Sequence, residues 1–116
     1  MLSAVRTCLL HPEPINFALV LHQLFSSKFR CTSIRKGTWQ VLKDGVWHDI
    51  EEGYVLYKHI HSTLLPMLQS ELETLTGEEC VTASHSIKLL TKVPFKSNVM
   101  KEAAVLFYGE EGGLSL

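Results

Sequence analysis

The sequence predicts an α+β protein in which about four helices pack around one small antiparallel β-hairpin. Apolar residues recur at spacings of three and four over most of the 116 residues, which is the period of helices that bury one face. Residues 38–50 replace this period with β-branched and aromatic residues on both sides of Asp44-Gly45. Asp-Gly between two such runs is typical of a two-residue hairpin turn, because that turn needs positive φ at both central positions. With 46% apolar and 20% charged residues, the chain has the composition of a single globular domain.

The first helix is predicted over residues 14–29. Its apolar residues follow the positions i, i+4, i+7 and i+8 of one helix face, namely Phe17, Leu21, Leu24 and Phe25. Pro14 suits the first turn, where the N–H that proline lacks would have no partner. We assign residues 1–13 to an N-terminal extension that precedes the folded domain.

The hairpin is predicted over residues 38–42 and 46–50. With a two-residue Asp44-Gly45 loop, the cross-strand pairs are Lys43–Val46, Leu42–Trp47, Val41–His48, Gln40–Asp49 and Trp39–Ile50. Because side chains alternate between the two faces of a sheet, Trp39 and Trp47 point to opposite sides. The face of Trp39 is the more apolar, so we expect Trp39 to be buried against the helices. Trp47 shares the other face with Leu42, and we expect it to be accessible to a base or to a partner protein.

The residues after the hairpin return to the helical period. An apolar stripe from Leu56 to Leu75 predicts a second helix, which Gly77 is expected to end. Pro66 lies inside this stripe, and an interior proline costs about 3 kcal/mol, so the helix should be kinked or split there.

Two further helices are predicted toward the C-terminus. One covers residues 82–93 and is ended by Pro94, and the other runs from a Ser97 N-cap to Tyr108, with Gly109 just beyond its end. Residues 14–108 therefore form the predicted domain, and residues 109–116 form a disordered tail.

Charge and hydropathy exclude several classes of protein. Eleven Lys and Arg residues against twelve Asp and Glu residues give a net charge of −1, so nucleic-acid binding would have to use a local patch. No apolar run approaches the ~20 residues that cross a bilayer. The N-terminal apolar stretch is broken by His11, Pro12 and Pro14, which does not fit a secretory signal. We expect an intracellular, soluble protein with no membrane partner.

Motifs for catalysis and for metal binding are missing from the sequence. It contains no GxxxxGK[ST], GxGxxG, HExxH or GxSxG, so by itself the chain is not expected to be an enzyme, to hold a cofactor or to take a small-molecule substrate. His59 and His61 are two apart in a predicted helix and so point about 200° apart. Cys31 with His48 would lack an orienting third group. No CxxC pair exists, so we expect neither a metal site nor a disulfide.

A run of cations is the one feature that suggests binding. Between residues 28 and 43 there are five positive residues and no acidic one, namely Lys28, Arg30, Arg35, Lys36 and Lys43. Cations contact phosphates while aromatic rings stack on bases at ~1–3 kcal/mol per base, so we take these five residues and Trp47 as candidate nucleic-acid-binding residues. The alternative interpretation is a solvated loop and edge strand, where lysine and arginine discourage aggregation. A second series, formed by Lys88, Lys92, Lys96 and Lys101, is interpreted as a solvated helix face.

Two segments carry a resemblance to a known family. In the first, a helix is followed by Phe29, Cys31, Ser33, Ile34, Trp39, Leu42, Trp47, Ile50, Gly53, Tyr54 and Leu56 at characteristic spacing. The second is PFKSNVMKEAAVLFY near the C-terminus. Both resemble the region between the primase and superfamily 3 helicase domains of the primase–helicase proteins of nucleocytoplasmic large DNA viruses, such as poxvirus, asfarvirus and mimivirus relatives.

The resemblance implies a non-catalytic, helicase-associated domain that links primase to helicase in DNA replication. Its expected partners are single-stranded or forked DNA, other replication proteins and the helicase part that this sequence lacks, in the cytoplasm or nucleus of a host cell. The family continues into an ATPase, whereas this sequence ends in GEEGGLSL, so we expect a fragment and no ATP hydrolysis. The alternative is a stand-alone protein-interaction module that uses its Trp-bearing hairpin for docking and binds no nucleic acid.

Overall fold

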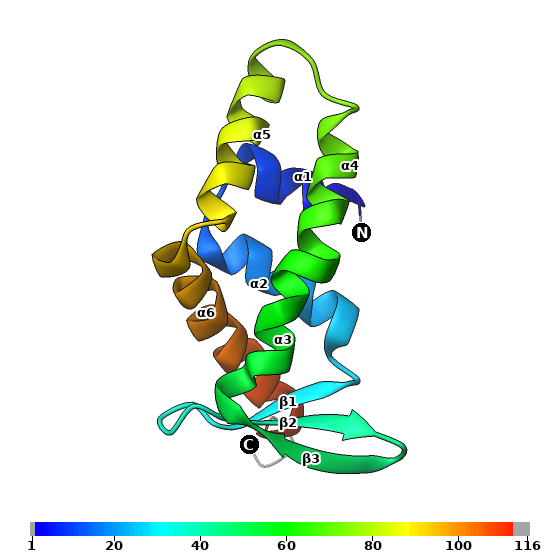
Figure 1. Ribbon diagram of the computed structural model, residues 1–116, viewed down its shortest axis with the longest axis vertical. Helices are drawn as coiled ribbons and strands as arrows, with labels where there is room; N and C mark the ends of the chain where they lie inside the picture. Colours follow the sequence, from blue (N-terminus) through cyan, green and yellow to red (C-terminus); the bar gives the residue numbers. More distant parts are fainter. Residues whose placement is uncertain (1, 113–116) are drawn as a thin grey trace.

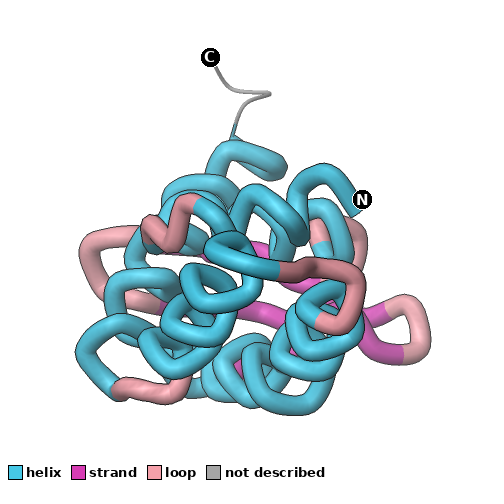
Figure 2. Tube along the Cα trace, turned by 90° about the horizontal axis from the view of Figure 1, so that it is seen from above, coloured by secondary structure: helices cyan, strands magenta, loops and turns pink. Residues whose placement is uncertain are grey.

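The computed structural model describes residues 2–112 and has the expected α+β class. Its main elements, in chain order, are α1 (Leu2–Leu10), α2 (Pro14–Phe25), β1 (Phe29–Ser33), β2 (Thr38–Lys43), β3 (Val46–Ile50), α3 (Tyr54–His59), α4 (Leu65–Leu72), α5 (Gly77–Leu90) and α6 (Val93–Gly112). Helices α1, α4 and α5 pack together at one end of the molecule, and the strands form a sheet at the other end (Figure 1). Helix α6 packs on α2 and on β1, and the helices lie to one side of the sheet (Figure 2).

The hairpin has the predicted register. Strands β2 and β3 pair antiparallel through Lys43–Val46, Leu42–Trp47, Val41–His48, Gln40–Asp49 and Trp39–Ile50. Asp44 and Gly45 both have positive φ, 54° and 77°, as the two-residue turn requires. The turn residues therefore determined which side chains face the helices.

A third strand replaces the end of the predicted first helix. Helix α2 ends at Phe25 instead of Phe29, and β1 pairs antiparallel with β2, so the sheet has the order β1-β2-β3. Phe29 and Cys31 are buried, while the residues that alternate with them are more exposed. This period of two was overlooked because the apolar helical stripe immediately precedes it.

The second predicted helix is one rod with a wider turn in its middle (Figure 1). A π-helical segment, Ile60–Leu64, joins α3 to α4. Pro66 is the second residue of α4, where it lacks the N–H for a helical hydrogen bond, and its ring would crowd the carbonyl four residues earlier. The π turn just before the proline accommodates both effects, which is the physical form that the predicted kink takes.

The ends of the last two helices differ from the prediction. Helix α5 begins at Gly77 and not at Thr82, and its first turn contains Glu78 and Glu79, which favour a helix N-terminus. Pro94 does not end a helix but is the second residue of α6, a position where proline is tolerated. Helix α6 continues past Tyr108 to Gly112, so Gly109 does not end it. Residues 113–116 of the predicted tail lie outside the described part.

The N-terminal segment belongs to the folded core and is not an extension outside it. Val5, Cys8 and Leu9 of α1 are fully buried, and Ser86 of α5 donates its hydroxyl hydrogen bond to the Leu9 carbonyl at 2.6 Å. The spacing of the three buried residues is that of one helix face. Their short stripe was hidden by the Pro12 and Pro14 break that follows it.

Gly53 illustrates how closely the sheet and helices approach. It has a φ of 70° between β3 and α3, and it is buried. A Cβ atom built on it would lie 3.0 Å from Trp39 Nε1 and 3.0 Å from Met100 Cε. The glycine is needed here both for its backbone conformation and for its lack of a side chain.

Candidate nucleic-acid interface

The candidate residues do not form one continuous patch. They are distributed over both faces and both ends of the sheet. The turn between β1 and β2, with Arg35 and Lys36, lies at one end, and the turn after Lys43 lies at the other (Figure 1). The five cations are therefore close together in the sequence but lie in separate parts of the sheet.

Arg30 and Trp47 meet on the sheet face that points away from the helices, which we call the open face. The guanidinium carbon of Arg30 lies 4.1 Å from the centroid of the Trp47 ring. Arg30 Nε also donates to Gln40 Oε1 at 2.8 Å, and Gln40 Nε2 donates to Asp49 Oδ1 at 2.9 Å. The sequence predicted only Leu42 as a shield for Trp47, whereas the structure adds a cation over one side of the indole.

The other two cations of the strands lie apart from this stack. Lys28 is exposed just before β1, and its carbonyl accepts a hydrogen bond from the Leu42 N–H at 2.7 Å. Its charge acts on His59, which packs beside Phe25 and Phe29 on the helix side of the sheet. Lys43 is exposed opposite Val46. Alternation along β2 places Lys43 on the same side as Trp39, so it does not share the open face with Trp47.

The β1–β2 turn presents Arg35 and Lys36. The Gly37 N–H donates to the Ile34 carbonyl at 3.3 Å, and Gly37 has a φ of 67°. The Lys36 N–H donates to Ser33 Oγ at 3.2 Å. These contacts define a hydrogen-bonded turn with glycine at its last position, where its left-handed conformation returns the chain to β2. Arg35 and Lys36 occupy the two central positions and are exposed.

A pocket of about 390 Å³ lies between this turn and α6, and we call it the turn pocket. Its lining residues are Ile34, Arg35, Lys36, Gly37, Trp39, Met100, Lys101 and Ala104. Among the described residues of the lining, three side chains are cationic and none is acidic. Several of the others are apolar, so the lining combines positive charge with apolar surface.

The role of α6 in this pocket was not predicted from the sequence. Lys101 was interpreted as part of a solvated helix face, but the fold brings it beside Arg35 and Lys36, more than sixty positions earlier in the chain. Lys96 of the same series is only 7% exposed. Its Nζ lies 2.8 Å from His61 Nε2, within hydrogen-bond distance. Lys88, Lys92 and Lys101 are exposed, as a solvated face requires, and only Lys96 of this series is buried.

Other titratable side chains have structural surroundings. Burial raises the pKa of the Cys8 thiol to about 12 and also raises that of Cys31, so both stay protonated at neutral pH. Burial, together with the nearby Lys28 charge, lowers the pKa of His59. Among residues 2–112, no group of three or more His, Cys, Asp or Glu side chains could hold a metal ion.

No helix within the described residues is long and apolar enough to span a membrane. Comparisons of the chain with protein-family models, with curated proteins and with solved structures give no match in any of the three cases.

Proposed function

We propose that this chain is a non-catalytic domain that contacts single-stranded DNA through the open face of its sheet. The observation that carries the proposal is the stack of Arg30 on Trp47. Single-stranded nucleic acids bind to surfaces where bases stack on aromatic rings or on guanidinium planes while cations contact the backbone. The pair offers one group of each kind, an indole ring and a guanidinium, and Arg30 also supplies a positive charge.

The stack is held in a defined geometry before any ligand arrives. The hydrogen bond from Arg30 to Gln40 fixes the guanidinium, and Gln40 is itself fixed by Asp49. Preorganised side chains lose less conformational entropy on binding, so the same contacts give a higher affinity for the ligand than mobile side chains would. The resemblance to viral primase–helicase proteins supports DNA as the ligand and replication as the process in which the domain acts.

Asp49 favours a second candidate function. Its carboxylate is exposed on the same face, two residues after Trp47, and would repel a phosphate that lies close to it. A surface with both signs of charge around a tryptophan also suits a protein partner. The second candidate is therefore a docking module that binds a replication protein and no nucleic acid.

The experiment that tests the proposal is fluorescence anisotropy of a labelled oligonucleotide with three variants. Trp47→Ala should weaken binding by roughly tenfold, because base stacking contributes ~1–3 kcal/mol, and Trp47→Phe should restore most of the affinity. His48→Ala is the matched control, since this exposed neighbour belongs to the opposite face of β3. Equal affinities for Trp47→Ala and His48→Ala, or no binding by the unaltered chain at low salt, would overturn the proposal.

A further inference from the structure

We propose that the turn pocket binds the terminal phosphate of a nucleotide. This inference rests on the proposed function and extends it, because it assigns to the end of a DNA strand a site distinct from the open face. The β1–β2 turn forms one end of the sheet (Figure 1). The pocket lies on the helix side of this turn, between it and α6, so a strand bound across the open face would pass around the turn to place its last residue there.

The charges of the pocket match a dianion better than a singly charged group. Arg35, Lys36 and Lys101 contribute three positive charges, and none of the lining residues that the structure describes is acidic. Within the described part of the chain, none of the three forms an ion pair. A phosphate monoester carries about −1.5 to −2 at neutral pH, whereas an internal phosphodiester or a carboxylate carries a single charge. The net attraction is therefore greatest for a terminal phosphate.

The geometry of the pocket suits the remainder of a nucleotide. Arg35 and Lys36 come from the centre of a hydrogen-bonded turn, and Lys101 comes from a helix, so two independent elements define the opening. Met100 and Ala104 line the pocket from α6. A volume of about 390 Å³ is within the range of small-molecule sites, about 300–1,000 Å³, and this apolar lining can cover a sugar or the edge of a base.

The test compares four ligands with the full chain. The first three are oligonucleotides of about 12 nucleotides, within the ~4–16 that small single-strand-binding domains cover, ending in a 5′-phosphate, a 3′-phosphate or no phosphate. The fourth is a free nucleoside monophosphate, titrated by calorimetry against the unphosphorylated nucleoside. We expect one terminal phosphate to tighten binding about tenfold, which corresponds to ~1.4 kcal/mol, and we expect the nucleoside monophosphate to bind where the nucleoside does not.

Variants locate the effect. The double variant Lys36→Gln with Lys101→Gln should abolish the difference in affinity between phosphorylated and unphosphorylated ligands. The control is Lys88→Gln with Lys92→Gln, two exposed lysines on and just after α5, and it should preserve that difference. Both double variants should keep the melting temperature of the unaltered chain, since all four side chains are exposed.

The outcomes separate this inference from the proposed function. Oligonucleotides that bind equally with and without a terminal phosphate would overturn the pocket assignment and leave the open face intact. If no oligonucleotide binds but the nucleoside monophosphate binds in a Lys101-dependent manner, the proposed function fails and the pocket stands. A phosphoserine peptide that binds more tightly than the nucleotide would overturn the assignment to nucleotides.

Discussion

At the scale of single residues, the two tryptophans of the sheet have different surroundings and should have different roles. Trp39 is 4% exposed, and its ring centroid lies 5.4 Å from that of Phe107 in α6. Its indole also lies so close to Gly53 that a Cβ atom on Gly53 would be 3.0 Å from Trp39 Nε1. Trp47 is half-buried beneath the Arg30 guanidinium and contributes to a surface.

Alanine substitutions should distinguish these roles. Trp39→Ala should lower the free energy of unfolding by roughly 3–5 kcal/mol, because it leaves a large cavity in the core. Trp47→Ala should cost about 1 kcal/mol or less, since it removes a partly exposed cation–π contact. Urea denaturation followed by circular dichroism measures both. A loss at Trp47 as large as that at Trp39 would contradict the assignment of Trp47 to a binding surface.

The register of the hairpin was predictable because the Asp44-Gly45 turn and the alternation of side chains are both local. The role of Lys101 was not predictable in the same way. Its contribution to the turn pocket depends on how α6 crosses β1, which is a tertiary arrangement that no spacing within the helix reveals. The burial of Lys96 depends equally on a partner, His61, thirty-five positions away.

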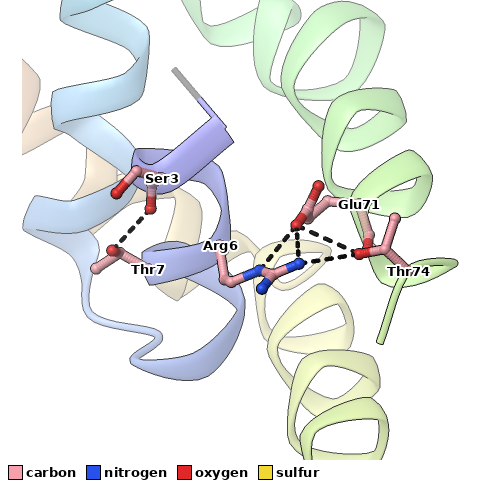
Figure 3. A network of polar contacts seen from close by, with 5 residues as sticks. All are labelled: Ser3, Arg6, Thr7, Glu71 and Thr74. Atoms are coloured by element: carbon pink, nitrogen blue, oxygen red, sulfur yellow. Dashed lines mark hydrogen bonds and ion pairs between the residues drawn. The ribbon is translucent and has the colours of Figure 1, made fainter. Parts of the chain in front are cut away.

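At the scale of elements, α1 is attached to the rest of the protein by a polar clamp (Figure 3). Arg6 of α1 contacts Glu71 of α4 through Nε at 2.9 Å and Nη2 at 2.8 Å, and Nη2 also donates to Thr74 Oγ1 at 3.2 Å. The Glu71 side chain is 8% exposed, so Arg6 supplies hydrogen bonds that water can barely reach to make. The clamp adds to the apolar contacts of α1 with α4 and α5.

Removal of one partner of this clamp should reveal its contribution. Arg6→Ala should lower the free energy of unfolding by about 1–3 kcal/mol, since it leaves the Glu71 carboxylate buried with fewer donors. Combining Arg6→Ala with Glu71→Leu should recover much of this loss, because no buried charge then remains. Thermal unfolding of the two variants provides the comparison. An unchanged melting temperature for Arg6→Ala would mean that the clamp does not contribute to holding α1 in place.

The element-level differences from the sequence prediction share one cause. Strand β1 and helix α1 are short, so each shows only a brief run of alternating or helically spaced apolar residues. Each also lies next to a stronger sequence signal for a different structure. The helical period before β1 extended the first predicted helix too far, and the prolines after α1 suggested an unfolded start. Pro94 was likewise interpreted as a helix end, although proline fits the first turn of a helix equally well.

At the scale of the whole molecule, stability should depend on pH through His59. This side chain packs beside Phe25 at a centroid distance of 4.5 Å, and its Nδ1 lies 2.9 Å from Thr63 Oγ1. Burial and the Lys28 charge lower its pKa below the ordinary value of 6.5, so the folded state favours the neutral imidazole. The unfolded chain then binds more protons than the folded chain between the two pKa values.

The sign of the effect follows from this difference. The stabilising contribution of neutral His59 is fully present above the unfolded pKa of 6.5 and is lost as the pH falls through the lower, folded value. Urea unfolding at several pH values should show a free energy that declines below about pH 6.5, and His59→Gln should flatten this decline. A profile that His59→Gln leaves unchanged would assign the decline to other groups.

The central claim is that the sheet and its turn contact single-stranded DNA, and the salt dependence of binding tests it most directly. Each phosphate contact on a single strand contributes about −0.7 to the slope of log K against log salt. Arg35→Glu with Lys36→Glu should therefore make the slope shallower by about 1.4 for two lost contacts, whereas Lys88→Glu with Lys92→Glu should leave it unchanged. An affinity that does not vary with salt, or equal changes in slope for the two pairs, would contradict a localised nucleic-acid interface.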